Sequence, residues 1–394
     1  YGVPLVTGAT AVDALLEGLR RFDPEVVVDL ADEPVLDARL RLRLAAITLL
    51  GGACYRGSDF RFDPPPRPAV ATKPSLAVIG TGKRSGKTAV AAALARLLDE
   101  AGTPPVVVTM GRGGPAQPEV IDPASFDLSP AGLLALSSGG RHAASDHVED
   151  ALVARVTTIG TRRCGGGLAG APFEASFEAG VRLANARPES LLLLEGSGQA
   201  IPPVRADATL CVVPAGADPT LVTGYLGAYR WLLSDAVVIT MSDAPLARPG
   251  MVAALEEAIR GLAPGIGVVH TTFRPSPLSP ISGAQIFYAT TAPPQVSHLL
   301  TEHLEREHDC KVVGVSHALA NRPQLRDDLE GLEGADVLVV ELKAAAIDLA
   351  ARVAAERGIG VVFCENRIVS IGGDASFGDL ARSTVDLAVE RFHT

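Results

Sequence analysis

The sequence predicts an α/β protein in which a parallel sheet is covered by helices on both faces. Short apolar runs of β type alternate with helical stretches along most of the chain, the order that produces parallel sheets. The runs are apolar at successive positions rather than alternate ones, as in strands buried on both faces. The 394 residues are 47% apolar and 20% charged, which indicates a folded chain of two or three domains.

Residues 1–70 form a first block. Residues 24–29 predict a buried strand, and Asp32 with Pro34 predicts the start of a helix that runs to about Ile47. The proline-rich stretch 63–68 predicts a stiff linker, which places a domain boundary near residue 70. Because the chain begins with Tyr1 rather than Met, we expect this block to be the C-terminal part of a larger N-terminal α/β domain.

The remaining chain divides into a nucleotide-binding domain, residues 71–281, and a C-terminal α/β subdomain, residues 282–394. One continuous sheet through both parts would give the same sequence pattern. The predicted strands of the first part are residues 75–80, 105–110, 191–195, 209–214, 236–241 and 265–273. Those of the second part are residues 285–290, 311–316, 336–341 and 360–364.

The strongest motif follows the first strand of the nucleotide-binding domain. A glycine-rich loop ends in Gly-Lys-Thr and leads into a helix with an apolar face, the arrangement of a P-loop. Loop amides and the helix N-terminus bind phosphates, Lys87 is expected to bridge the β- and γ-phosphates, and Thr88 to ligate Mg²⁺. A tight strand–helix turn alone would not need this ending. The predicted nucleotide-binding residues are Gly80, Thr81, Gly82, Lys83, Arg84, Ser85, Gly86, Lys87 and Thr88.

A second motif, which ends in a carboxylate, supports the prediction of a nucleotide site. Gly80 precedes Gly86 by one residue more than the usual P-loop pattern allows, and the loop resembles that of the dethiobiotin synthetase family. The stretch of four leucines that ends at Glu195-Gly-Ser-Gly198 is similar to a strand end of the same family. We predict Thr88 and Glu195 as the Mg²⁺ ligands. The alternative for Glu195 is a helix cap or a solvated turn.

The residues before the five lysines indicate which nucleotide base the protein does not recognise by a known motif. None of Lys73, Lys83, Lys87, Lys311 and Lys343 follows an asparagine, which argues against the guanine motif of switch GTPases. Two segments after strands, residues 240–243 and 273–275, are candidate base-recognition loops. Both fit ordinary loops equally well, and Lys343 fits an anion contact or a solvated helix position equally well.

Arginine, histidine and glycine are dense between the phosphate loop and Glu195. Arg112 precedes two glycines, His142 lies in His-Ala-Ala-Ser-Asp-His147, and Arg162 and Arg163 precede a run of three glycines. On loops beside a phosphate loop, these guanidiniums would bind a substrate that has several phosphate or carboxylate groups. Arg205 is a further arginine of this kind. Weaker alternatives are surface charge for each arginine, zinc binding by the two histidines and a nucleophilic role for Cys164.

Composition excludes several classes of protein. A net charge of −10 argues against a nucleic-acid binder, and no uncharged apolar run reaches the ~18 residues of a membrane span. The five cysteines are scattered without a CxxC pair, and no signal peptide is visible. We therefore expect a reduced, cytoplasmic protein.

The combined motifs resemble the cyclic 2,3-diphosphoglycerate synthetase family over essentially the whole chain. The residues of the resemblance begin at Gly80, Met110, His142, Arg162, Glu195 and Glu341, with Asp29 and Tyr55 in the first block. The resemblance implies an enzyme of about this fold that uses ATP and Mg²⁺ to convert 2,3-diphosphoglycerate into its cyclic anhydride, with release of ADP and phosphate. Within this hypothesis, the catalytic residues are Lys87, Arg112, His142, Arg162 and Arg163. We expect a homodimer.

Two rival functions keep the same fold. A dethiobiotin-synthetase-like ligase would activate a carboxylate, but the dense arginines favour a more highly charged acceptor. A P-loop ATPase switch of the partitioning type would need a second lysine at the position of Gly82. Lys83 lies one residue away from that position.

Overall fold

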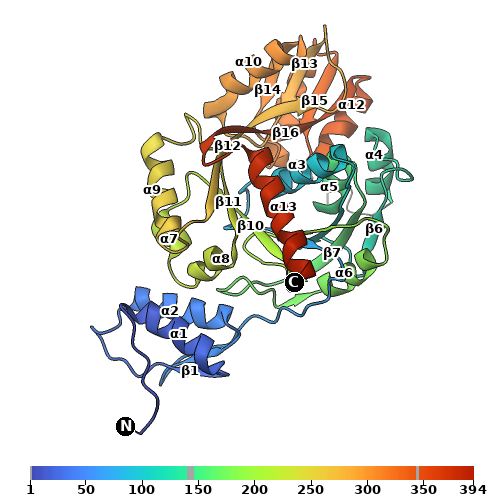
Figure 1. Ribbon diagram of the computed structural model, residues 1–394. Coiled ribbons are helices and arrows are strands. Elements are labelled where there is room, and N and C mark those ends of the chain that lie inside the picture. The colour runs from blue at the N-terminus through green and yellow to red at the C-terminus, as the bar shows by residue number, and fades with distance from the viewer. Residues whose placement is uncertain (1, 140–145, 343–345) are drawn as a thin grey trace.

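The computed structural model describes residues 2–139, 146–342 and 346–394, with the backbone alone for residues 346–348. The N-terminal block forms a small unit of its own, drawn in blue in Figure 1. Its strands make a three-stranded sheet, and its second helix packs against a helix of the main body. Its elements are α1 (Ala11–Phe22), β1 (Val26–Val28), α2 (Ala38–Leu50), β2 (Cys54–Arg56) and β3 (Arg61–Phe62).

The middle of the chain alternates strands and helices as predicted. Its strands are β4 (Ser75–Gly80), β5 (Val106–Gly111), β6 (Glu119–Ile121), β7 (Thr158–Cys164), β8 (Glu174–Ala175), β9 (Leu192–Glu195), β10 (Ala208–Pro214), β11 (Ala236–Thr240) and β12 (Gly267–Pro277). Its helices are α3 (Lys87–Glu100), α4 (Pro130–Ser138), α5 (Asp146–Ala154), α6 (Phe177–Asn185), α7 (Pro219–Thr223), α8 (Gly227–Leu233) and α9 (Pro249–Arg260).

The C-terminal part continues the same sheet. Its strands are β13 (Gln285–Ala289), β14 (Lys311–Ser316), β15 (Val337–Glu341) and β16 (Gly360–Gly373). Its helical segments are η1 (Pro294–Val296), α10 (Ser297–His308), α11 (Arg322–Asp328), η2 (Leu329–Leu332), η3 (Ala346–Ala351), α12 (Arg352–Glu356) and α13 (Phe377–His393). Helix α13 returns to the middle part and packs on β4 and β10 (Figure 1).

Within the described residues, one thirteen-stranded sheet spans both parts. Its order is β14-β13-β15-β16-β12-β11-β10-β4-β9-β5-β7-β6, with β8 paired to β7. Most neighbours are parallel, whereas β16 runs antiparallel to β12 and joins the two parts. The boundaries near residues 70 and 281 stay a prediction. None of the helices in the described part of the chain is long and apolar enough to span a membrane.

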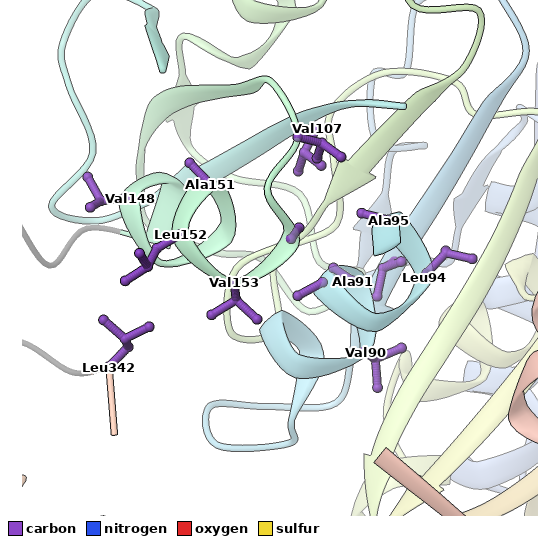
Figure 2. Close-up of a cluster of buried hydrophobic side chains, with 14 of the residues drawn as sticks. Val90, Ala91, Leu94, Ala95, Val107, Val148, Ala151, Leu152, Val153 and Leu342 are labelled. Atoms are coloured by element: carbon purple, nitrogen blue, oxygen red, sulfur yellow. The ribbon is translucent and has the colours of Figure 1, made fainter. Parts of the chain in front are cut away.

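Helices cover both faces of the central sheet, as the apolar runs predicted. Along β4, Leu76 and Val78 face one core, and Ala77 and Ile79 face the other. The first core contains side chains from α3, α4, α5 and α13, and the second contains side chains from α2, α6, α8 and α9. Figure 2 shows part of the first core, where side chains of α3 and α5 gather with Val107, and Leu342 joins from the C-terminal part.

Two predictions for the first block are wrong. Strand β1 is present, but Val26 and Val28 are exposed because β1 pairs only with β2 at the edge of its small sheet. The following helix begins at Ala38 rather than near Asp32, since Asp37 is the residue whose side chain accepts a hydrogen bond from a first-turn amide, that of Leu40. Helix α1, capped by Thr10 and Asp13, was not predicted at all.

Two segments predicted as loops belong to strands. Arg162 and Arg163 lie on β7. Toward the end of this strand, exposed and buried residues alternate. Residues 273–275 lie inside β12, which extends beyond its predicted end because it pairs with β16. Every strand predicted from residue 75 onward is present.

Candidate active site

The phosphate loop connects β4 to α3 and is held in place by both. The alanines and leucines of α3 favour a helix, and Gly86 at its start has a φ of 89°, which suits glycine. A Cβ atom on Gly86 would lie 2.4 Å from the Phe273 ring, so glycine also lets β12 approach the loop. The loop conformation therefore depends on residues from two separate strands.

Lys87 lies at the start of α3 and is almost completely buried. Its Nζ donates hydrogen bonds to the carbonyl oxygen of Gly82, at 2.8 Å, and to Ser85 Oγ, at 3.3 Å. Burial lowers the pKa of Lys87, and the negative charge of Glu195 opposes that shift. The ammonium thus sits under the loop, where a lysine can reach a bound phosphate.

The two predicted metal ligands lie side by side. Thr88 Oγ1 donates to Glu195 Oε1 at 3.0 Å, and Thr109 Oγ1 donates to Glu195 Oε2 at 3.1 Å. Strand β9 delivers Glu195 to the end of the sheet, where only 2% of the residue is exposed. Burial raises the pKa of Glu195. A hydroxyl and a carboxylate in contact fit a hard cation such as Mg²⁺.

The two β7 arginines differ in burial and in their contacts. The Arg163 side chain is buried, and its guanidinium donates to the carbonyl oxygens of Gly165, at 2.7 Å, and Ser197, at 2.8 Å. Desolvation and the nearby Arg112 lower the pKa of Arg163. Arg162 is exposed, and its Nε donates to the carbonyl oxygen of Gly114 at 2.6 Å.

A cavity of about 810 Å³ opens over the phosphate loop. The middle part contributes the following lining residues: Lys83, Arg84, Ser85, Gly86, Lys87, Thr88, Arg112, Asp146, Glu149, Arg163, Glu195 and Ser197. Lining residues from the C-terminal part include Thr291, Val296, Leu300, Glu341, Leu342, Cys364, Glu365 and Asn366. The middle part thus supplies the cationic lining residues together with several acidic ones, and the C-terminal part supplies apolar and acidic ones.

The candidate base-recognition residues also face this cavity. Met241, Asp243, Phe273 and Arg274 are among its lining residues. Arg274 forms an ion pair with Asp243 at 2.8 Å, and Thr272 Oγ1 donates to the same carboxylate. The pair links the segment after β11 to β12, and the role of these residues in base recognition stays a prediction.

Other predicted residues lie elsewhere or outside the described residues. His142 and Lys343 are outside the described residues. Arg162 and Arg205 are not among the lining residues of the cavity, and Cys164 has an exposed free thiol. No group of three or more histidine, cysteine or acidic side chains in the described part of the chain could hold a metal, and the zinc hypothesis gains no support there.

Sequence reasoning gave no role of their own to four acidic side chains of the site. Asp146 and Glu149 line the cavity, and Asp150 on the same helix is buried beside Glu195. Their signal in the sequence was the density of acidic residues at 146–150, where three of the five residues are Asp or Glu. Glu341 was quoted only as part of a motif; its carboxylate accepts hydrogen bonds from Thr290 Oγ1, at 2.6 Å, and from the amide and hydroxyl of Thr291, both at 2.8 Å.

Comparisons with known proteins identify the family of this chain. The models of the N-terminal, P-loop and C-terminal domains of cyclic 2,3-diphosphoglycerate synthetase match residues 1–63, 75–272 and 277–367. A cyclic 2,3-diphosphoglycerate synthetase of Rubrobacter xylanophilus is 48% identical over 383 residues, 97% of this chain and 87% of the relative. That of Methanothermobacter thermautotrophicus is 43% identical over 379 residues, 96% of this chain and 82% of the relative.

A solved structure, LpxK from Aquifex aeolicus in complex with ATP, shares 12% identity at a TM-score of 0.46 and covers 83% of this chain and 90% of its own. The family assignment rests instead on the three domain models and on the relatives. Both kinds of match name the same family from the N-terminal block to the C-terminal part. By these matches, the chain belongs to the cyclic 2,3-diphosphoglycerate synthetase family.

Proposed function

We propose that the protein is an ATP-dependent ligase that closes 2,3-diphosphoglycerate into cyclic 2,3-diphosphoglycerate and releases ADP and phosphate. One observation supports this most directly: Arg112 and Arg163 line the same cavity as the phosphate loop. ATP and the substrate are both polyanions, so their encounter requires cationic groups that offset the repulsion. The cavity contains those groups on the phosphate loop, as Lys83, Arg84 and Lys87, and on other segments, as Arg112 and Arg163.

The proposed reaction has two steps. In the first, an oxygen of one substrate phosphate attacks the γ-phosphorus of ATP, the bond from that phosphorus to the β–γ bridging oxygen breaks, and ADP leaves. In the second, an oxygen of the other substrate phosphate attacks the phosphorus of the activated one. The bond from that phosphorus to the oxygen that bridges it to the transferred phosphoryl group breaks, inorganic phosphate leaves with that oxygen, and the internal anhydride closes the ring. Both steps depend mainly on positioning and on charge stabilisation.

We assign different roles in this reaction to different residues of the chain. Lys87 and the loop amides bind the β- and γ-phosphates, and Arg163 and Arg112 hold the substrate phosphates close together. Thr88 and Glu195 would hold Mg²⁺, whose charge would offset that of the phosphates. His142 stays a proposed member of the substrate site.

Phosphorus NMR of the protein with ATP, Mg²⁺ and 2,3-diphosphoglycerate tests the proposal. We expect new signals of a cyclic pyrophosphate that grow in step with ADP. ATP hydrolysis without those signals would contradict the proposal and favour the carboxylate-activating ligase or the ATPase switch. The homodimer and the cytoplasmic location are further proposals, which sedimentation and cell fractionation test.

A further inference from the structure

Asp150 is a buried carboxylate that the reaction described above does not use. It lies on α5, one turn after Asp146, and only 1% of the residue is exposed. Within the described part of the chain, no donor forms a hydrogen bond to either of its carboxylate oxygens. The group that interacts with it most closely is the carboxylate of Glu195, itself 2% exposed.

Two ionised carboxylates buried against each other are unfavourable unless a proton or a cation lies between them. Each loses its hydration, and their charges repel in a medium of low dielectric constant. Asp146 and Glu149 add further negative charge around the pair. Lys87 is near Glu195, but its ammonium donates to Gly82 and Ser85 and to neither carboxylate. The protein groups described here therefore leave the pair short of positive charge.

We infer that Asp150 belongs to the divalent-cation site of Thr88 and Glu195 and supplies its second buried negative charge. This inference rests on the proposed function, which brings a cation to Glu195 with the nucleotide. Mg²⁺ is commonly bound through one or two carboxylates together with phosphate oxygens and water, rather than by an all-protein cage. Two carboxylates and one hydroxyl agree with that pattern and with the absence of a larger acidic or histidine cluster in the described residues.

Substitution of Asp150 by asparagine removes the charge and keeps the shape. We expect Asp150→Asn to weaken the binding of Mn²⁺, followed by electron paramagnetic resonance at saturating ADP, by tenfold or more. Binding of ADP in the presence of a chelator should not change. Asp327→Asn, the same substitution at an exposed aspartate on α11, is the matched control and should leave Mn²⁺ affinity unchanged. Wild-type Mn²⁺ affinity in Asp150→Asn would overturn the inference.

Thermal unfolding in a chelator separates this role from a structural one. If Asp150 serves the cation, the asparagine variant should unfold at the same temperature as the wild type or at a higher one, because like-charge repulsion is relieved. A lower unfolding temperature without metal would mark Asp150 as a structural residue and overturn the inference. Asp150→Ser, smaller and also uncharged, gives the same expectation for Mn²⁺ binding and provides that measurement where asparagine is not tolerated.

The inference and the proposed function can fail separately. Absence of the cyclic product in the NMR experiment would reject the reaction and leave the Mn²⁺ titration valid. Unchanged Mn²⁺ binding in Asp150→Asn would reject the role of Asp150 whatever product the wild type makes. A wild-type protein that binds no Mn²⁺ with ADP would overturn the cation site as a whole.

Discussion

Neighbouring residues on one strand have different tasks in this site. Arg163 faces the cavity and donates to carbonyl oxygens of two glycine-rich segments, at Gly165 and Ser197. Arg162 is exposed and is not itself a lining residue, but its Nε donates to the carbonyl oxygen of Gly114, which lines the cavity. Because successive side chains of a strand alternate, Arg163 faces the cavity directly, whereas Arg162 adjoins it through Gly114.

At the residue scale, we therefore expect Arg163 and Arg162 to differ. Arg163→Ala should lower kcat/KM by about 10²–10³-fold, since it removes a charge from the transferring phosphates. Arg162→Ala should have a smaller effect, through the loop that it holds. Steady-state measurement of ADP release would show this, with unchanged ADP binding in both variants as the control. Equal losses would mean that both arginines act on the substrate.

At the scale of elements, the N-terminal block is held together by one buried carboxylate. Asp29, just after β1, accepts hydrogen bonds from Arg41 Nε on α2, at 2.7 Å, and from the Tyr55 hydroxyl on β2, at 2.8 Å. Burial alone would raise the pKa of Asp29, but bonds from Ala31 N–H, Tyr55 and Arg41 together lower it. The carboxylate thus joins β1, α2 and β2.

Asp29→Asn should destabilise this block in a pH-dependent way. A carboxyl whose folded pKa is depressed stabilises the fold above its ordinary value of 3.8, and that contribution is lost as the pH falls through the lower, folded value. We expect the variant to lose about 1–3 kcal/mol of unfolding free energy at neutral pH and less in acid. Urea unfolding followed by circular dichroism at several pH values measures the difference. Asp63→Asn, at an exposed pair with Arg61, is the control and should be near neutral.

At the scale of the whole molecule, the antiparallel pair of β12 and β16 places the C-terminal part over the phosphate loop. The two parts are also linked by an ion pair between Arg96 of α3 and Glu365 of β16. Apolar side chains near the start of α10 and the carboxylate of Glu341 consequently share a cavity with Lys87. A ligand on the phosphate loop therefore contacts, or lies near, both parts of the molecule.

Hydrogen exchange provides the test at this scale. Binding of Mg²⁺·ADP with 2,3-diphosphoglycerate should slow amide exchange both in the phosphate loop and in residues 291–300. Residues 11–62 should show no comparable change, because the cavity is lined by residues 83–366. Protection confined to the phosphate loop would contradict a site shared between the two parts.

The sequence by itself predicted the α/β fold, the phosphate loop and the family because these depend on local patterns. Residues 75–88 are contiguous, so their strand, loop and helix are visible in the sequence. The start of α2 and strand β7 were misplaced or missed because their apolar signal is weak and their ends depend on caps and neighbours. Helix α1 was overlooked, although its cap at Thr10 and Asp13 and its apolar face are visible in the sequence.

Only the tertiary structure decided which distant polar groups meet. Asp150 and Glu195 are separated by 45 residues, and Glu341 lies farther still along the chain. In the folded protein, Glu195 and Glu341 line the same cavity, and Asp150 is buried beside Glu195. Whether Arg162 or Arg163 faces the cavity depends on the register of β7 against β5. Burial, charge and pairing are properties of the packed molecule, because they depend on which surfaces the sheet and its helices remove from water.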